Sequence, residues 1–126
     1  MRDPLFDESN WDQIAVTETG AAASSIVDHT VGSGIVERVI CMTAYHDDVA
    51  ARNCYSTLII NGVVLQMDSP HSILATGADD RYQFYEQVPM PAKLELRAGD
   101  VLRWNCTSIG AGKIATMHLL LLRRKG

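Results

Sequence analysis

The sequence predicts an all-β protein, an antiparallel β-sandwich with an extended N-terminal arm. Three observations predict this fold class. Apolar and polar residues alternate over short stretches, which gives each strand one apolar face that can be buried and one polar face that can meet solvent. Gly, Pro and Asn-Gly turn signals separate the stretches, and no stretch has convincing helical spacing. The 126 residues fit one domain that can bury a sizeable core.

Residues 1–12 are expected to form the arm. Acidic residues keep this segment polar, while Leu5, Phe6 and Trp11 provide side chains that it can bury. Pro4 favours an extended path over a helix. The segment is therefore predicted to lie outside the main fold.

Residues 13–126 are expected to form a single sandwich domain. Asn61-Gly62 lies between two β-branched runs and predicts a two-residue hairpin, because both turn residues need positive φ. Ala98-Gly99-Asp100 predicts a second tight connection, and the segment 46–53 a polar loop or one helical turn. The expected strands cover residues 13–19, 26–31, 35–45, 55–60, 63–67, 81–88, 93–97, 101–106 and 114–122. Two packed sheets bury the apolar faces of so many strands, and a jelly roll is the economical arrangement.

Charge and composition exclude several classes of protein. The net charge of −4 and the lack of a basic stripe argue against nucleic-acid binding. The basic residues Arg123, Arg124 and Lys125 are interpreted as a solvated end. The N-terminus lacks the apolar region of a signal peptide, and Leu119–Leu122 is too short to cross a bilayer. We therefore expect neither nucleic acid nor membrane as a partner.

The three cysteines are scattered along predicted strands. Cys41, Cys54 and Cys106 have neither the number of a disulfide framework nor the spacing of a zinc site. They are expected to be free, buried thiols, which suits folding in a reducing cytoplasm.

No catalytic motif, cofactor site or metal site is predicted, and we expect the protein not to be an enzyme. The histidines His29, His46, His71 and His118 stand singly, whereas a cupin-like metal enzyme needs a His-x-His pair with further ligands. A cupin-like metal enzyme stays open as the third functional alternative, and His118 is its first candidate metal ligand.

Two further motifs have simpler interpretations. Asp47-Asp48 and Asp79-Asp80 are expected to be solvated loop carboxylates, because Ca²⁺ needs six to eight oxygen ligands. The segment 110–113 lacks the full spacing of a phosphate-binding loop and is interpreted as a turn.

A second functional class is a carbohydrate-binding or tail receptor-binding jelly-roll module. Such modules stack sugar rings on exposed aromatic side chains. The candidates here are Tyr82, Phe84, Tyr85 and Trp104, although a core of this size claims several aromatic residues for itself.

Four features of the chain together resemble a known family of proteins. They are the arm, the strand-rich body, the basic end and the strand-turn-strand segment Leu94-Glu-Leu-Arg-Ala-Gly-Asp-Val-Leu102. Over roughly residues 35–124 the chain resembles small jelly-roll virion proteins of tailed bacteriophages, the capsid decoration or cement proteins and related tail components. The resemblance implies a structural protein that binds the outer surface of the virion. Its partners would be the major capsid protein and itself, as a homodimer or homotrimer, after assembly in the host cytoplasm.

The arm then has two interpretations. It can place Leu5, Phe6 and Trp11 on a neighbouring subunit as an interface, or it can be a frayed terminus.

Overall fold

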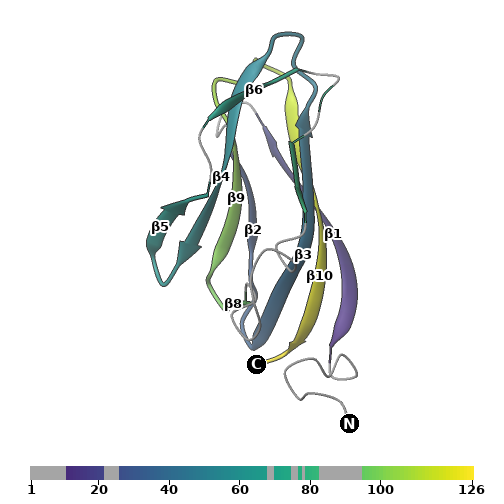
Figure 1. Cartoon of the computed structure of the whole chain (residues 1–126), viewed down its shortest axis with the longest axis vertical. Coiled ribbons are helices and arrows are strands. Elements are labelled where there is room, and N and C mark those ends of the chain that lie inside the picture. Colours follow the sequence, from purple (N-terminus) through teal and green to yellow (C-terminus); the bar gives the residue numbers. More distant parts are fainter. Residues whose placement is uncertain (1–10, 22–25, 68–69, 75–76, 78, 83–94) are drawn as a thin grey trace.

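The computed structural model describes residues 11–21, 26–67, 70–74, 77, 79–82 and 95–126. Within these residues the chain forms ten strands and no helix. The strands build two antiparallel sheets that pack face to face, as Figure 1 shows. The predicted all-β sandwich is confirmed. No helix long and apolar enough to cross a membrane exists in the described part of the chain.

Each sheet has five strands. The first sheet has the order β1-β10-β3-β7, with β8 also paired to β3. Its strands are β1 (Asp12–Ala21), β3 (Ile35–His46), β7 (Asp79–Tyr82), β8 (Glu95–Arg97) and β10 (Ile114–Lys125). The second sheet has the order β2-β9-β4-β5, with β6 also paired to β4. Its strands are β2 (Ile26–Thr30), β4 (Arg52–Ile60), β5 (Val63–Gln66), β6 (His71–Ile73) and β9 (Val101–Cys106).

Both predicted turns are present. Asn61 and Gly62 have φ values of 51° and 78°, and they join β4 to β5 as a two-residue hairpin. Gly99 has a φ of 88° in the tight connection from β8 to β9. There the Asp100 carboxylate accepts a hydrogen bond from the Arg97 backbone N–H at 2.9 Å. This second turn links the two sheets, because β8 lies in the first sheet and β9 in the second.

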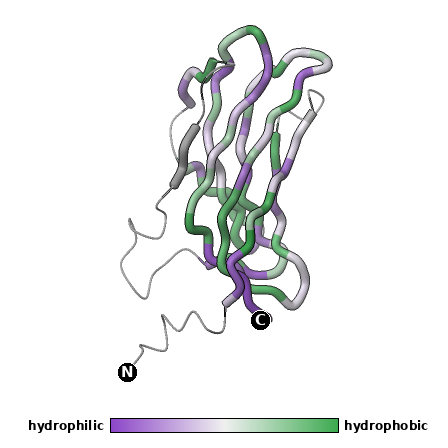
Figure 2. The backbone as a smooth tube through the Cα atoms, turned by 90° about the vertical axis from the view of Figure 1, so that its right-hand side faces the viewer, coloured by the Kyte–Doolittle hydropathy of each residue, from purple (hydrophilic) through white to green (hydrophobic). Residues whose placement is uncertain are grey.

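The core lies between the sheets. Along β9 the burial alternates, and Trp104 is completely buried. Figure 2 shows hydrophobic and hydrophilic residues alternating along the strands. The large, fully buried apolar side chains come from both sheets and include Met42, Leu96, Leu102, Trp104, Met117 and Leu121. One face of each sheet therefore supplies the core, as the alternating pattern predicted.

Several element boundaries differ from the prediction. β10 extends to Lys125, and its last three residues pair with residues 35–37 of β3. The interpretation of this basic segment as a solvated end is wrong for Arg123 and Arg124, which are half-buried members of a paired strand, whereas Lys125 is exposed. β1 begins at Asp12, so the last residue of the predicted arm is already in the sheet. A short strand, β6, lies within the expected connection 68–80. Most of the strand expected over 81–88 lies outside the described residues.

Candidate interaction surface

The most exposed apolar strand of the described chain is β5. Val63, Val64 and Leu65 are 58%, 65% and 50% exposed. Among the described strands β5 pairs only with β4, so it forms an edge of the second sheet. Figure 1 shows the β4–β5 hairpin projecting from the side of the sandwich.

The exposure affects both faces of β5. Val63 and Leu65 pair with Ile60 and Leu58 and therefore share their face of the sheet. Leu58 belongs to the core, yet Leu65 beside it is half exposed. The core-side face of the sheet thus continues into β5 without the cover that buries Leu58.

Charge does not protect this edge. No charged residue occurs between Arg52 and Asp68. Edge strands of natural proteins usually carry lysines, prolines or bulges that prevent pairing with other chains. A charge-free apolar edge suits a partner that adds a strand or covers the apolar side chains.

Of the predicted interface residues, only Trp11 is described; Leu5 and Phe6 lie outside the described residues. The Trp11 ring faces the guanidinium groups of Arg38 at 4.6 Å and Arg124 at 4.9 Å. Such cation–π contacts stabilise the ring where the predicted arm meets the sandwich. Trp11 is thus packed against β3 and β10 of its own chain.

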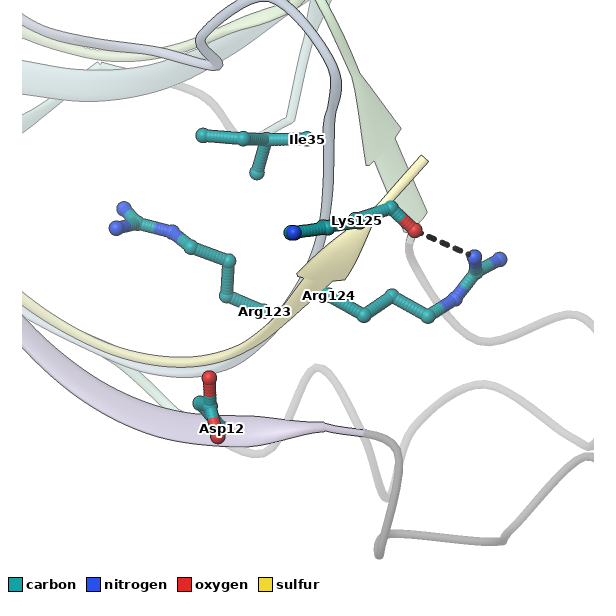
Figure 3. A pocket seen from close by; sticks show the side chains of 5 residues that line it. All are labelled: Asp12, Ile35, Arg123, Arg124 and Lys125. Carbon is teal, nitrogen blue, oxygen red and sulfur yellow. Dashed lines mark hydrogen bonds between the residues drawn. The ribbon is translucent and has the colours of Figure 1, made fainter.

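A hollow of about 250 Å³ lies beside this contact, lined by Asp12, Ile35, Arg123, Arg124 and Lys125. Figure 3 shows Arg124 turned back towards the Lys125 carbonyl oxygen, which it contacts at 3.0 Å. Arg123 donates instead to the buried Glu37 carboxylate, with Nε 2.7 Å from Oε2. Two of the three cationic side chains therefore have intramolecular partners.

Glu37 also belongs to a buried charged network that joins the two sheets. Its Oε1 atom lies 2.6 Å from His29 Nε2, and His29 Nδ1 lies 2.8 Å from Glu18 Oε2. Glu37 is 1% exposed and His29 4%. The buried Glu37 carboxylate thus has a His29 ring nitrogen at Oε1 and the Arg123 guanidinium at Oε2. These two partners reduce the cost of burying Glu37.

Asp48 is a second buried polar centre, and its interpretation as a solvated loop residue is wrong. It is 3% exposed, and its Oδ2 atom accepts hydrogen bonds from Gly110 N at 2.6 Å and Arg52 Nε at 2.8 Å. The Ala50 N–H donates to Oδ1 at 3.2 Å. The Gly110 hydrogen bond, followed by those from Arg52 and Ala50, lowers the pKa of Asp48 to about 2. Asp48 therefore ties the β3–β4 connection to the β9–β10 connection.

The histidines do not form a cluster in the described chain. No group of three or more His, Cys, Asp or Glu residues there is arranged to hold a metal ion. His118, the candidate cupin ligand, has Nδ1 2.9 Å from Thr17 Oγ1 and Nε2 3.0 Å from the Tyr45 hydroxyl. Buried His46 has Nε2 2.7 Å from the Ile73 carbonyl oxygen. Both rings therefore have protein hydrogen-bond partners.

The sugar-stacking candidates are only partly described. Trp104 is completely buried in the core and offers no face to a ligand. Phe84 and Tyr85 lie outside the described residues. The segment 110–113 forms the predicted turn, with a Lys113 N to Gly110 O hydrogen bond of 3.1 Å.

No family model matches the sequence, and no curated protein matches it significantly. The exposed β5 edge is thus the clearest candidate site. The sequence analysis missed it, although its signal was present in the charge-free residues 53–67.

Proposed function

We propose that this protein is a structural virion subunit of the bacteriophage decoration type, which acts by binding other protein subunits rather than by catalysis. The observation that carries the proposal is the β5 edge, with three exposed apolar side chains and no charge. The resemblance of the segment 94–102 and its surroundings to phage decoration proteins supplies the biological setting.

We infer further that the sandwich is a jelly roll. β1 pairs with β10, β2 with β9 and β3 with β8. Strands from the two ends of the chain thus pair in nested order, as when one long hairpin is wrapped into two sheets. This order supports the jelly-roll prediction and agrees with the proposed class of protein.

The β5 edge can bind a partner in two ways at once. Its outer backbone N–H and C=O groups can extend a neighbouring sheet, while Val64 and Leu65 project to opposite faces of the strand. The surface of a four-residue strand is nevertheless much smaller than the ~800 Å² that each partner buries in a standard interface. We therefore expect β5 to act together with a second contact, for which the predicted arm, residues 1–12, is the candidate.

Purification of the native particle tests the proposal directly. The chain is expected at a copy number comparable to that of the major capsid protein. A handful of copies would assign it to a tail or vertex instead, and its absence from particles would overturn the proposal.

The contribution of β5 can be separated from folding by a matched pair of variants. Val64→Lys places a charge on the edge, whereas Val49→Lys makes the same change at an 88% exposed loop position. We expect Val64→Lys to weaken attachment to particles tenfold or more, about 1.4 kcal/mol, while Val49→Lys binds like the parent protein. Equal binding of both variants would remove β5 from the interface.

The arm is tested in the same assay. Deletion of residues 1–10 leaves Trp11 and β1 in place and is expected to preserve the β-sheet circular dichroism spectrum. It should weaken attachment to particles, because Leu5 and Phe6 are lost. Unchanged attachment would show that the N-terminus is passive.

A further inference from the structure

We propose that Cys54 and Cys106 form an oxidisable dithiol, which closes into a disulfide between β4 and β9 within one chain. The two residues are direct partners in the register of the two strands, and both side chains are completely buried. This inference is independent of the proposed function.

The strand register places the two cysteines at a position suited to a disulfide. The next pair along the ladder is Asn53 and Thr107, and the Thr107 N–H donates to the Asn53 carbonyl oxygen at 3.0 Å. Hydrogen-bonded and non-hydrogen-bonded pairs alternate along antiparallel strands, so Cys54 and Cys106 form a non-hydrogen-bonded pair. Cα atoms in such pairs are about 4.5 Å apart, which lies within the roughly 4.4–6.8 Å range of disulfides.

The two thiols already interact in the reduced protein. A hydrogen bond from the Cys54 side chain lowers the pKa of Cys106, and the positive charge of Arg52 acts in the same direction. Burial acts in the opposite direction, and the first effect is the larger. Because the thiolate is the reactive form, Cys106 is the thiol expected to react first.

Hydrogen peroxide is an oxidant of the required class, a two-electron acceptor. The Cys106 thiolate attacks one peroxide oxygen, the O–O bond breaks, and the released hydroxide takes up the thiol proton to form water. The resulting sulfenic acid is attacked by the Cys54 sulfur, which forms the S–S bond and releases a second water. Two thiols and one peroxide thus give one disulfide and two waters.

Cys41 provides an internal control. It is the third free cysteine, half-buried in β3 of the other sheet, where Tyr82 is its partner on β7. It has no cysteine opposite it among the described strand pairs.

The test is peroxide treatment of the folded protein and of its Cys41→Ala variant. Titration of thiols after denaturation should show loss of two thiols in each, with a mass decrease of two hydrogen atoms. Non-reducing peptide mapping should link Cys54 to Cys106, and dithiothreitol should reverse the link. The oxidised form should unfold at a higher Tm, because the crosslink restricts the unfolded chain.

A second variant tests the order of the steps. In Cys54→Ala the sulfenic acid at Cys106 has no partner and should be trapped by dimedone, whereas Cys106→Ala should give less adduct. Retention of both thiols by the folded Cys41→Ala protein, under peroxide that oxidises the unfolded chain, would overturn the proposal. Formation of disulfides only between chains would do the same.

Discussion

The two outer strands of the second sheet, β2 and β5, differ in how their edges are protected. β2 carries Asp28, paired with Arg103 of β9, and His29, which reaches across to Glu18 and Glu37 of the first sheet. β5 carries no charged residue and exposes its apolar side chains on both faces. Charged edges resist pairing with foreign strands, whereas neutral apolar edges permit it. This difference agrees with a structural role of β2 and with the proposed role of β5 in association.

The largest expected effect comes from placing the same charge on each strand. Val27 of β2 is completely buried, whereas Val64 of β5 is 65% exposed. Val27→Lys should destabilise the fold by about 4 kcal/mol or more, because it buries an unpaired charge. Val64→Lys should change the free energy of unfolding by about 0.5 kcal/mol or less. Urea unfolding of both variants checks this contrast, and similar losses would show that β5 also supports the fold.

A smaller but still large effect is expected from Glu37. Glu37→Ala leaves His29 and Arg123 without their shared partner in a buried site. Removal of one member of a buried ion pair costs about 3–5 kcal/mol. Glu18→Ala is the control, since the Glu18 side chain is 33% exposed and the His29–Glu37 contact remains. Equal unfolding free energies for the two variants would contradict the role assigned to the network.

Acid sensitivity is expected at Asp48, in the connection between β3 and β4. The folded state lowers the pKa of Asp48 from 3.8 to about 2. The ionised Asp48 carboxylate therefore contributes its full stabilisation above pH 3.8. That contribution is lost as the pH falls through the folded-state pKa.

The variant Asp48→Asn tests this assignment. It should lower the Tm at neutral pH by several degrees and flatten the fall of Tm between about pH 4 and pH 2. Asp47→Asn is the adjacent control, because Asp47 is exposed and its Oδ1 atom accepts a hydrogen bond from the Ile114 N–H at 2.7 Å. If both variants kept the parent's acid profile, Asp48 would not be the responsible group.

The smallest effect is expected at Asp28. Arg103 donates to both carboxylate oxygens of Asp28, with Nε 2.6 Å from Oδ1 and Nη2 2.9 Å from Oδ2. The side chains of Asp28 and Arg103 are 32% and 29% exposed, so solvent screens the ion pair. Asp28→Asn should cost about 0.2–1 kcal/mol. The cost should shrink in high salt; a loss that is independent of salt would indicate packing rather than charge.

Local patterns predicted the strands and turns well. Alternation along Val101–Cys106 and the Asn61-Gly62 pair act within a few residues, so the sequence carries them directly. The candidate site was less predictable. Leu5 and Phe6 were chosen because they are apolar residues in a polar segment, whereas the exposure of Val64 depends on what covers β5.

The sequence by itself determined the all-β class, the hairpin turn, the free cysteines and the lack of charged residues over 53–67. Only the tertiary structure brought Glu37 to His29, buried Asp48 under Gly110 and set Cys54 opposite Cys106. These contacts join residues on different strands or loops, and about two fifths of the chain separates Cys54 from Cys106 in the sequence. Strand order and register decide such contacts, and a shift of one residue would turn each side chain to the opposite face of its sheet.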